Sequence, residues 1–152
     1  MKRRPIAVAV ARERARRAAE FLARDERVRL VFLFGSAADP DARSARDVDL
    51  AILSRPPLEL DELMRLRADL VAAAGAGLDL VSLNDASVVL AKEVANGGRC
   101  LFARTPEEET DFVVRARSRF WDWKPFLETQ WRLTGERLAA RLVRGQGDGP
   151  QA

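Results

Sequence analysis

The stretch Phe32-Leu33-Phe34-Gly35-Ser36, followed after ten residues by Asp47-Val48-Asp49-Leu50, decides the fold of this chain. It joins two apolar runs, 28–34 and 50–53, whose lengths and content of branched and aromatic residues are typical of β-strands. Residues two apart in a strand point to the same face, about 7 Å apart. Asp47 and Asp49 are therefore expected to project together, while the apolar residues between and after them face the other way.

This arrangement indicates a phosphate-handling metal site. Adjacent carboxylates repel each other, and near a core they are unfavourable unless a cation lies between them. Mg²⁺ is the obvious cation, because it prefers oxygen ligands and binds one or two carboxylates together with substrate phosphates. Gly35 lets the backbone approach a ligand closely, and backbone N–H groups with the Ser36 hydroxyl can hold phosphate oxygens. We therefore predict that Gly35 and Ser36 bind nucleotide and that Asp47 and Asp49 bind metal.

Each half of the motif also fits a purely structural role. Gly-Ser after a strand is usually a turn, and Asp-x-Asp is usually a solvated pair at a sheet edge or a helix cap. The order strand, Gly-Ser, ten residues, Asp-x-Asp, strand is far more specific. It resembles the signature of the nucleotidyltransferase superfamily related to DNA polymerase beta. More narrowly, the chain resembles the minimal nucleotidyltransferases that act as antitoxins beside HEPN-domain toxins, over residues 28–131 and most strongly over 32–53.

Amino-acid composition limits the kinds of metal site, disulfide and membrane segment that the chain can form. The chain has 152 residues, of which 47% are hydrophobic, enough for one domain with a core. There is no histidine, so any metal must be held mainly by carboxylates, which favours Mg²⁺ or Mn²⁺. The single cysteine, Cys100, excludes an internal disulfide and is interpreted as a small core residue. The sequence shows no signal-peptide pattern and no apolar run long enough to span a membrane, so a cytoplasmic protein without membrane contact is expected.

The net charge of +3 does not predict a nucleic-acid partner. The basic residues are mostly arginines interspersed with acids, and the clusters at 12–17 and 115–119 lie in segments of helical pattern. A solvated helix face is the usual explanation for such clusters. We therefore expect no direct contact with nucleic acid.

Periodicity and cap signals predict strands at 28–34, 47–53, 78–83 and 99–103 and helices at 6–24, 58–74 and 86–96. In the first helix, Val10, Ala18, Phe21 and Leu22 are expected to face the core. A long helical region opens at Thr105-Pro106. It is expected to break or kink at Pro125, which cannot donate the helical hydrogen bond, and to continue over 126–143.

Strands separated by helices indicate an α/β or α+β fold with one small mixed sheet. The resemblance implies the nucleotidyltransferase fold, a short mixed sheet with helices packed mainly on one face. We expect a nucleotidyltransferase core over 1–104, a C-terminal helical extension packed on that core over 105–144, and a disordered, glycine-rich tail over 145–152. The active site would lie at the sheet edge that carries the strand ends.

Asp79 is the candidate for a third carboxylate. The family adds an acid on a neighbouring strand, since two aspartates rarely hold both ions of a two-metal site. Asp79 lies in the apolar strand Leu78-Asp79-Leu80-Val81, where a lone charge is unfavourable. An ion pair with an arginine such as Arg99 is the structural alternative, and Asp85 is a rival acid in a context typical of a helix cap. Asp47, Asp49 and Asp79 are thus the predicted catalytic and metal-binding residues.

The chain departs from the family pattern in two places. After Gly-Ser these proteins often carry a basic residue followed by glycine, whereas this chain has Ala37-Ala38-Asp39-Pro40. Arg46 stands where a small hydroxyl residue is common. An acid at Asp39 disfavours a nearby triphosphate unless its side chain points away. These departures bear on nucleotide affinity more than on the metal carboxylates.

The segment Phe120–Phe126 is rich in aromatic residues, and Leu127, Trp131, Leu138 and Leu142 continue one apolar stripe. Such a stripe either closes the core or forms a surface for a partner.

The resemblance implies an enzyme that transfers AMP from ATP, with Mg²⁺ or Mn²⁺, to a hydroxyl of a cognate HEPN toxin ribonuclease. The acceptor is expected to be a tyrosine, and the two proteins are expected to form a hetero-oligomer. One alternative is an antitoxin that inhibits by stoichiometric binding alone. Another is a small-molecule nucleotidyltransferase of the aminoglycoside type, although few residues follow Val143 to form a substrate domain.

Overall fold

A four-stranded mixed sheet forms the centre of the protein, which a computed structural model describes over residues 3–146. The strands lie in the order β5–β4–β2–β6. Their bounds are Val28–Phe34 for β2, Val48–Ser54 for β4, Leu78–Ser82 for β5 and Arg99–Ala103 for β6. β4 and β5 run parallel, while β2 is antiparallel to both β4 and β6. All four predicted strands are therefore present, in the small mixed sheet that was expected.

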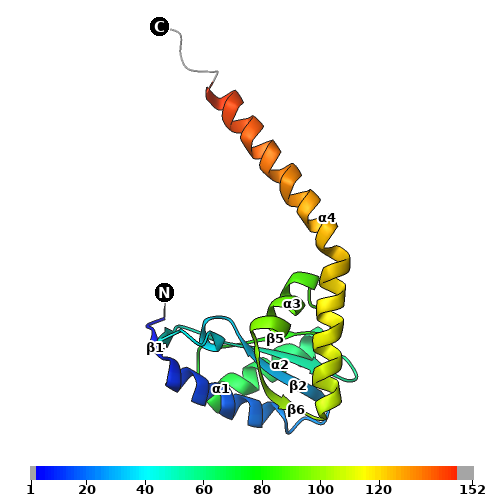
Figure 1. Cartoon of the computed structure of the whole chain (residues 1–152). Helices are drawn as coiled ribbons and strands as arrows, with labels where there is room; N and C mark the ends of the chain where they lie inside the picture. Colours follow the sequence, from blue (N-terminus) through cyan, green and yellow to red (C-terminus); the bar gives the residue numbers. More distant parts are fainter. Residues whose placement is uncertain (1–2, 147–152) are drawn as a thin grey trace.

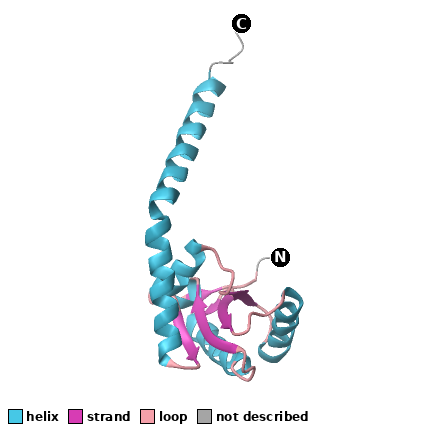
Figure 2. Cartoon of the chain, turned by 90° about the vertical axis from the view of Figure 1, so that its right-hand side faces the viewer, coloured by secondary structure: helices cyan, strands magenta, loops and turns pink. Residues whose placement is uncertain are grey.

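Helices cover both faces of this sheet (Figures 1 and 2). On one face, α1 (Val8–Leu22) and α2 (Leu60–Ala74) pack on a core that includes Val31, Leu33 and Leu50. On the other face, α3 (Val88–Gly97) and the start of α4 (Pro106–Gln146) pack on Leu30, Phe32 and Ala51. The expectation of helices mainly on one face is wrong, because β2 and β4 are apolar on both sides and each side needs a cover.

The N-terminal segment differs from the single helix predicted over 6–24. Ile6–Ala7 (β1) pairs antiparallel with Ser44–Ala45 (β3), and the helix begins only at Val8. The core face of α1 is lined by buried residues at helical spacing: Ala11, Ala15, Ala18, Ala19 and Leu22. Val10, predicted to face the core, is 51% exposed. The alanines let most of α1 lie close to the sheet, and Leu22 fills the wider space at its end. Val10 lies one position before Ala11 and therefore off this face.

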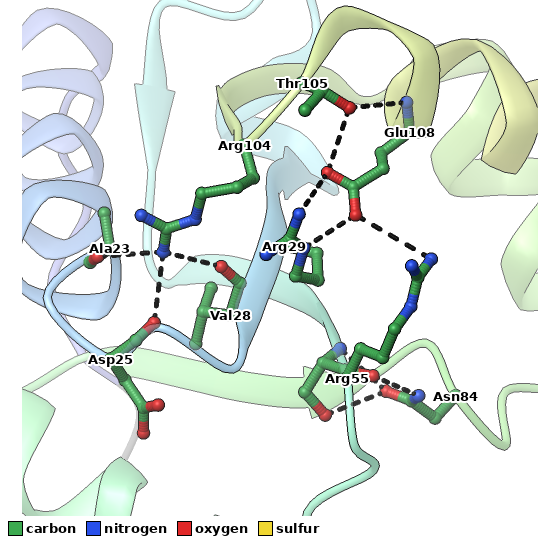
Figure 3. Close-up of polar contacts among 10 residues, drawn as sticks. Ala23, Asp25, Val28, Arg29, Arg55, Asn84, Arg104, Thr105 and Glu108 are labelled. Carbon is green, nitrogen blue, oxygen red and sulfur yellow. Dashed lines mark hydrogen bonds and ion pairs between the residues drawn. The ribbon is translucent and has the colours of Figure 1, made fainter.

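Arg104 stabilises the turn between α1 and β2 through hydrogen bonds. Its Nη2 donates to the carbonyl oxygens of Ala23, Asp25 and Val28 at 3.0, 3.2 and 2.9 Å (Figure 3). The guanidinium also lies over the ring of Phe102, 4.6 Å from its centroid. One arginine from beyond β6 thus joins three carbonyls of this turn, of which that of Asp25 also accepts the Val28 N–H at 3.0 Å.

The C-terminal helix α4 runs without interruption from Pro106 to Gln146, so of the two outcomes predicted at Pro125 the break is absent. The other outcome, a kink, is present, since Figure 1 shows that the helix axis changes direction in this region, where yellow turns to orange. Proline removes one helical hydrogen bond and crowds the preceding turn, which accounts for the bend. Of the predicted tail 145–152, residues 145–146 end this helix and the others lie outside the described residues.

Only the first half of α4 packs on the core. Phe112 contacts Phe32 with ring centroids 5.3 Å apart, and Ala116 is buried. Beyond Phe120 the helix extends away from the sheet (Figures 1 and 2), and Trp131 and Leu142 are 62% and 71% exposed. The extension is therefore packed on the core at its start and not over the whole of 105–144. Within residues 3–146, none of the helices is both long and apolar enough to cross a membrane.

Candidate active site

The end of β2 and the start of β4 bring Gly35 against Asp49. Phe34, the last residue of β2, is the ladder partner of Asp49. Gly35 follows with φ +73° and ψ −156°, a conformation that residues with a Cβ rarely adopt, and opens the short 3₁₀ helix η1 (Ser36–Ala38). A Cβ at Gly35 would lie 2.5 Å from Oδ2 of Asp49. Glycine is therefore required at this position for two reasons: its backbone conformation has a positive φ, and a Cβ would clash with the Asp49 carboxylate.

Asp79 lies on the other side of Asp49. The two residues are partners in the parallel ladder between β4 and β5. Asp47 comes two residues before Asp49, immediately ahead of β4, and is exposed. The fold thus places Asp47, Asp49 and Asp79 on two neighbouring chain segments at one edge of the sheet, next to Gly35.

The central carboxylate is electrostatically disfavoured. Burial raises the pKa of Asp49, and the negative charges of Asp79, Asp47 and Glu93 raise it further. The two flanking carboxylates have cationic partners, since Arg67 Nη2 lies 3.0 Å from Asp79 and Arg3 Nη1 lies 3.8 Å from Asp47. The structural alternative for Asp79, an ion pair, is therefore partly correct, but its partner comes from α2.

Within residues 3–146, no three acidic, histidine or cysteine side chains stand together as a set of metal ligands. The ion pairs of Asp47 and Asp79 provide a physical reason, because each arginine holds an outer carboxylate toward itself. The donors are nevertheless all carboxylate oxygens, which suit Mg²⁺ or Mn²⁺ rather than a transition metal that prefers nitrogen or sulfur. The chemistry of these residues fits a hard divalent cation.

Two arginines fix the loop that follows Gly35. Arg12 Nε donates to the carbonyl of Ala37, and Arg99 Nε donates to the carbonyl of Ala38, each at 3.1 Å. Arg99, predicted as a partner of Asp79, is therefore engaged elsewhere. Ala37 and Ala38 are buried, so packing explains why small residues occupy this part of the loop.

A hollow beside Gly35 and Ser36 is lined by two acids, Asp39 and Glu93. Glu93 comes from α3 and was not predicted, because only the packing of α3 brings it to this edge. Asp39 lines the hollow, and its Oδ1 accepts a hydrogen bond from the Asp41 N–H at 2.9 Å. A triphosphate at this position would meet negative charge on several sides, so it would need a cation to accompany it.

The rival acid Asp85 lies outside this site. It is exposed and follows the end of β5 opposite to Asp79. The helix cap predicted near Asn84 and Asp85 is at Ser87, whose hydroxyl accepts from the Leu90 N–H at 3.1 Å. Asn84 instead ties β5 to β4, since its side chain exchanges hydrogen bonds with the backbone of Ser54.

Comparisons with known proteins identify the family. The family profile for polymerase beta nucleotidyltransferases matches residues 17–107. The protein adenylyltransferase MntA of Shewanella oneidensis is 31% identical over 94 residues, which cover 62% of this chain and 67% of that protein.

Solved structures share the fold. One is the MNT antitoxin in complex with a tri-AMPylated HEPN toxin of Shewanella oneidensis, with a TM-score of 0.65 and 23% identity, covering 85% of this chain and 98% of that one. Another is a toxin–antitoxin structure with AMP-PNP, with a TM-score of 0.66 and 24% identity, covering 82% and 98% of the two chains.

Proposed function

Because this chain belongs to the polymerase beta family of nucleotidyltransferases, and within it to the minimal antitoxin nucleotidyltransferases, we propose that it transfers AMP from ATP to a hydroxyl of a HEPN-domain toxin and thereby neutralises it. The observation that carries the proposal is the contact of Gly35 with Asp49, with Asp79 on the neighbouring strand. The adenylyltransferase name of the 31% identical relative supports AMP as the transferred group. Tyrosine as the acceptor and the cytoplasm as the location are parts of this proposal.

The metal site of the proposal consists of Asp47, Asp49 and Asp79. Their all-oxygen donor set and the raised pKa of Asp49 both favour a bound cation, because a divalent ion offsets the mutual repulsion of the carboxylates. When bound, Mg²⁺ or Mn²⁺ would stabilise negative charge on the attacking and leaving oxygens. Arg3 and Arg67 neutralise the outer carboxylates in the metal-free protein.

The chain's own groups bind the phosphates and accept the proton. Backbone N–H groups and the hydroxyl at Gly35 and Ser36 bind the phosphates, and their positions are fixed by Arg12 and Arg99 through the loop carbonyls. The acceptor oxygen attacks the α-phosphorus, and pyrophosphate leaves. Asp79, which is 46% exposed, accepts the proton of the acceptor hydroxyl.

We further propose that the toxin contacts the projecting half of α4. Leu127, Trp131, Leu138 and Leu142 recur at intervals of four and seven residues, so they share one face of the helix. Trp131, Leu138 and Leu142 are all more than half exposed, and an apolar stripe of this kind is typical of a protein–protein interface. Because this face lies on the half of α4 that extends away from the sheet, it can bind a protein without displacing the core (Figure 2).

A second candidate function is inhibition by binding alone. It is favoured by one observation, the two acids Asp39 and Glu93 in the hollow beside Gly35 and Ser36, which oppose a triphosphate. Both candidates use the same partner surface, so only chemistry separates them.

The test is Asp47→Asn, with Asp85→Asn as the matched control, because Asp85 is an exposed acid outside the site. Each variant is mixed with toxin, ATP and Mg²⁺, AMP on the toxin is measured by mass spectrometry, and ribonuclease activity is titrated. We expect Asp47→Asn to bind the toxin but to lose transfer by several orders of magnitude, each factor of ten being about 1.4 kcal/mol. The control should modify and silence toxin at substoichiometric amounts.

This chain contains no tyrosine, so AMP linked to tyrosine in the mixture must be on the toxin. If Asp47→Asn inhibits in a one-to-one titration as well as the parent does, the binding-only function replaces the enzyme. If AMP is found only on this chain, transfer to the toxin is wrong.

A further inference from the structure

A second hollow lies at the opposite end of the sheet from Gly35 and Asp49. β4 runs from Asp49 to Ser54, and the hollow begins beside Leu53 and Arg55 and is closed by α3 and α4. Its volume is about 320 Å³, within the range of about 300–1,000 Å³ that is usual for small-molecule sites. The reaction proposed above uses none of its residues.

The hollow combines an apolar floor with an arginine rim. Leu53, Leu83 and Phe112 belong to the floor, and Phe112 is held in place by its contact with Phe32. The rim carries Arg55, Arg115 and Arg119. Arg115 and Arg119 lie one helical turn apart on α4, so both can reach one bound group. In the part of the chain that the structure describes, neither of them forms an ion pair.

The two acids that line the hollow, Glu108 and Asp111, neutralise little of the positive charge of its arginines. Glu108 is already satisfied by Arg29, whose Nε and Nη2 donate to its two carboxylate oxygens at 2.6 and 3.0 Å, and by the Thr105 hydroxyl at 3.1 Å (Figure 3). These partners, with Arg29 the strongest, lower the pKa of Glu108. Arg55 lies 3.7 Å from the same carboxylate and is 72% exposed, so it is free to turn toward a ligand.

The second acid, Asp111, is exposed and lies one turn before Arg115. With Glu108 neutralised by Arg29, the rim presents three guanidinium groups against one carboxylate. The hollow therefore suits a ligand that is anionic at one end and apolar at the other.

We propose that this hollow binds a nucleoside phosphate, at a site separate from the one that uses ATP as substrate. Arg115 and Arg119 hold the phosphate, because the planar guanidinium matches phosphate oxygens in bidentate hydrogen bonds. Arg55 closes over the phosphate from the end of β4. The base lies on the apolar floor beside Phe112, which distinguishes a nucleotide from inorganic phosphate.

The experiment measures binding of AMP and of inorganic phosphate to the full chain by calorimetry in the presence of EDTA, which removes any cation needed at the aspartate site. Arg115→Ala with Arg119→Ala is compared with Arg137→Ala and Arg141→Ala. The control arginines are also exposed and four residues apart on the same helix, but they lie outside the hollow. Circular dichroism checks that both double variants fold.

We expect AMP to bind in the absence of metal, at least tenfold more tightly than inorganic phosphate. The variant with both Arg115→Ala and Arg119→Ala should bind AMP at least tenfold more weakly than the parent, whereas the control double variant should bind it as the parent does. Absence of AMP binding, equal losses in both double variants, or equal affinities for AMP and phosphate would overturn the proposal. Tighter binding of an acidic peptide or of single-stranded RNA than of AMP at the same arginines would also overturn it. Asp47→Asn should keep this AMP binding, so the result is independent of whether the chain transfers AMP.

Discussion

Asp49 and Asp79 are direct partners in the parallel ladder between β4 and β5, so their carboxylates arise from neighbouring positions about 4.8 Å apart in the sheet. Gly35 lies on the other side of Asp49, where even a single Cβ would contact its carboxylate. Asp49 is thus the centre of the candidate site, with the phosphate-binding turn on one side and the third acid on the other.

Asp49→Asn should stabilise the metal-free protein in a pH-dependent way. The pKa of Asp49 is raised in the folded protein by burial, Asp79 and Asp47, so the folded state binds this proton more tightly than the unfolded state does. Its favourable contribution is complete below the ordinary pKa of 3.8 and is lost as the pH rises through the higher folded pKa. The melting temperature of Asp49→Asn in EDTA should therefore rise relative to that of the parent across this window and stay higher by a constant amount above it. A difference that does not vary with pH, or one matched by Asp85→Asn, would contradict the explanation.

Gly35→Ala should abolish AMP transfer and destabilise the fold. The conformation at φ +73°, ψ −156° costs a residue with a Cβ about 1–3 kcal/mol, and the new methyl group would displace Asp49. Gly135→Ala is the control, because Gly135 lies within α4 with no atom within 4 Å of its added Cβ. That variant should be more stable by about 0.5–1 kcal/mol. Urea unfolding of both variants checks the contrast, and equal effects would show that Gly35 is not special.

Arg104→Met should lower the free energy of unfolding by about 2 kcal/mol, because it removes the guanidinium donor that the carbonyls of Ala23, Asp25 and Val28 share, while keeping an apolar chain over Phe102. Arg65→Met is the control. It removes an exposed ion pair with Asp61, whose value is expected to be under about 1 kcal/mol. Chemical denaturation of the two variants gives the comparison, and a loss for Arg104→Met no larger than for the control would remove its structural role.

Trp131→Ser should weaken binding to the toxin at least tenfold without changing the melting temperature. The side chain is 62% exposed on the part of α4 that has left the core, so its removal costs no core packing. The exposed Glu136 lies on the opposite side of α4 from the apolar stripe, so Glu136→Ser should bind as the parent does. Surface plasmon resonance measures the affinity of each variant and of the parent for the toxin. A lower melting temperature would instead indicate that Trp131 packs within the protein.

The arrangement of the central site could largely be predicted from the sequence, for a local reason. The apolar runs 28–34 and 50–53 are joined by a short connection, so they pair as β2 and β4, and Phe34 then falls opposite Asp49. Gly35 and Asp49 are brought together by this pairing. The alternation of Val48, Leu50 and Ile52 likewise predicted that these three residues share one face, and all three are buried, whereas the burial of Ala51 on the other face did not follow from it.

The tertiary structure alone decided what surrounds that motif. Arg67 reaches Asp79, Glu93 reaches the hollow beside Gly35, and Arg55 lies near Arg115 only because helices far apart in the sequence pack on the same sheet. Periodicity shows that a face is apolar but not which element covers it. For this reason Val10 was predicted to be buried and is exposed, and the stripe through Trp131 could equally have closed the core. The sequence determined which residues can bind metal and phosphate. The packing of α1 to α4 determined which charged side chains lie beside them, since Coulomb interactions depend on distance in space and not on distance along the chain.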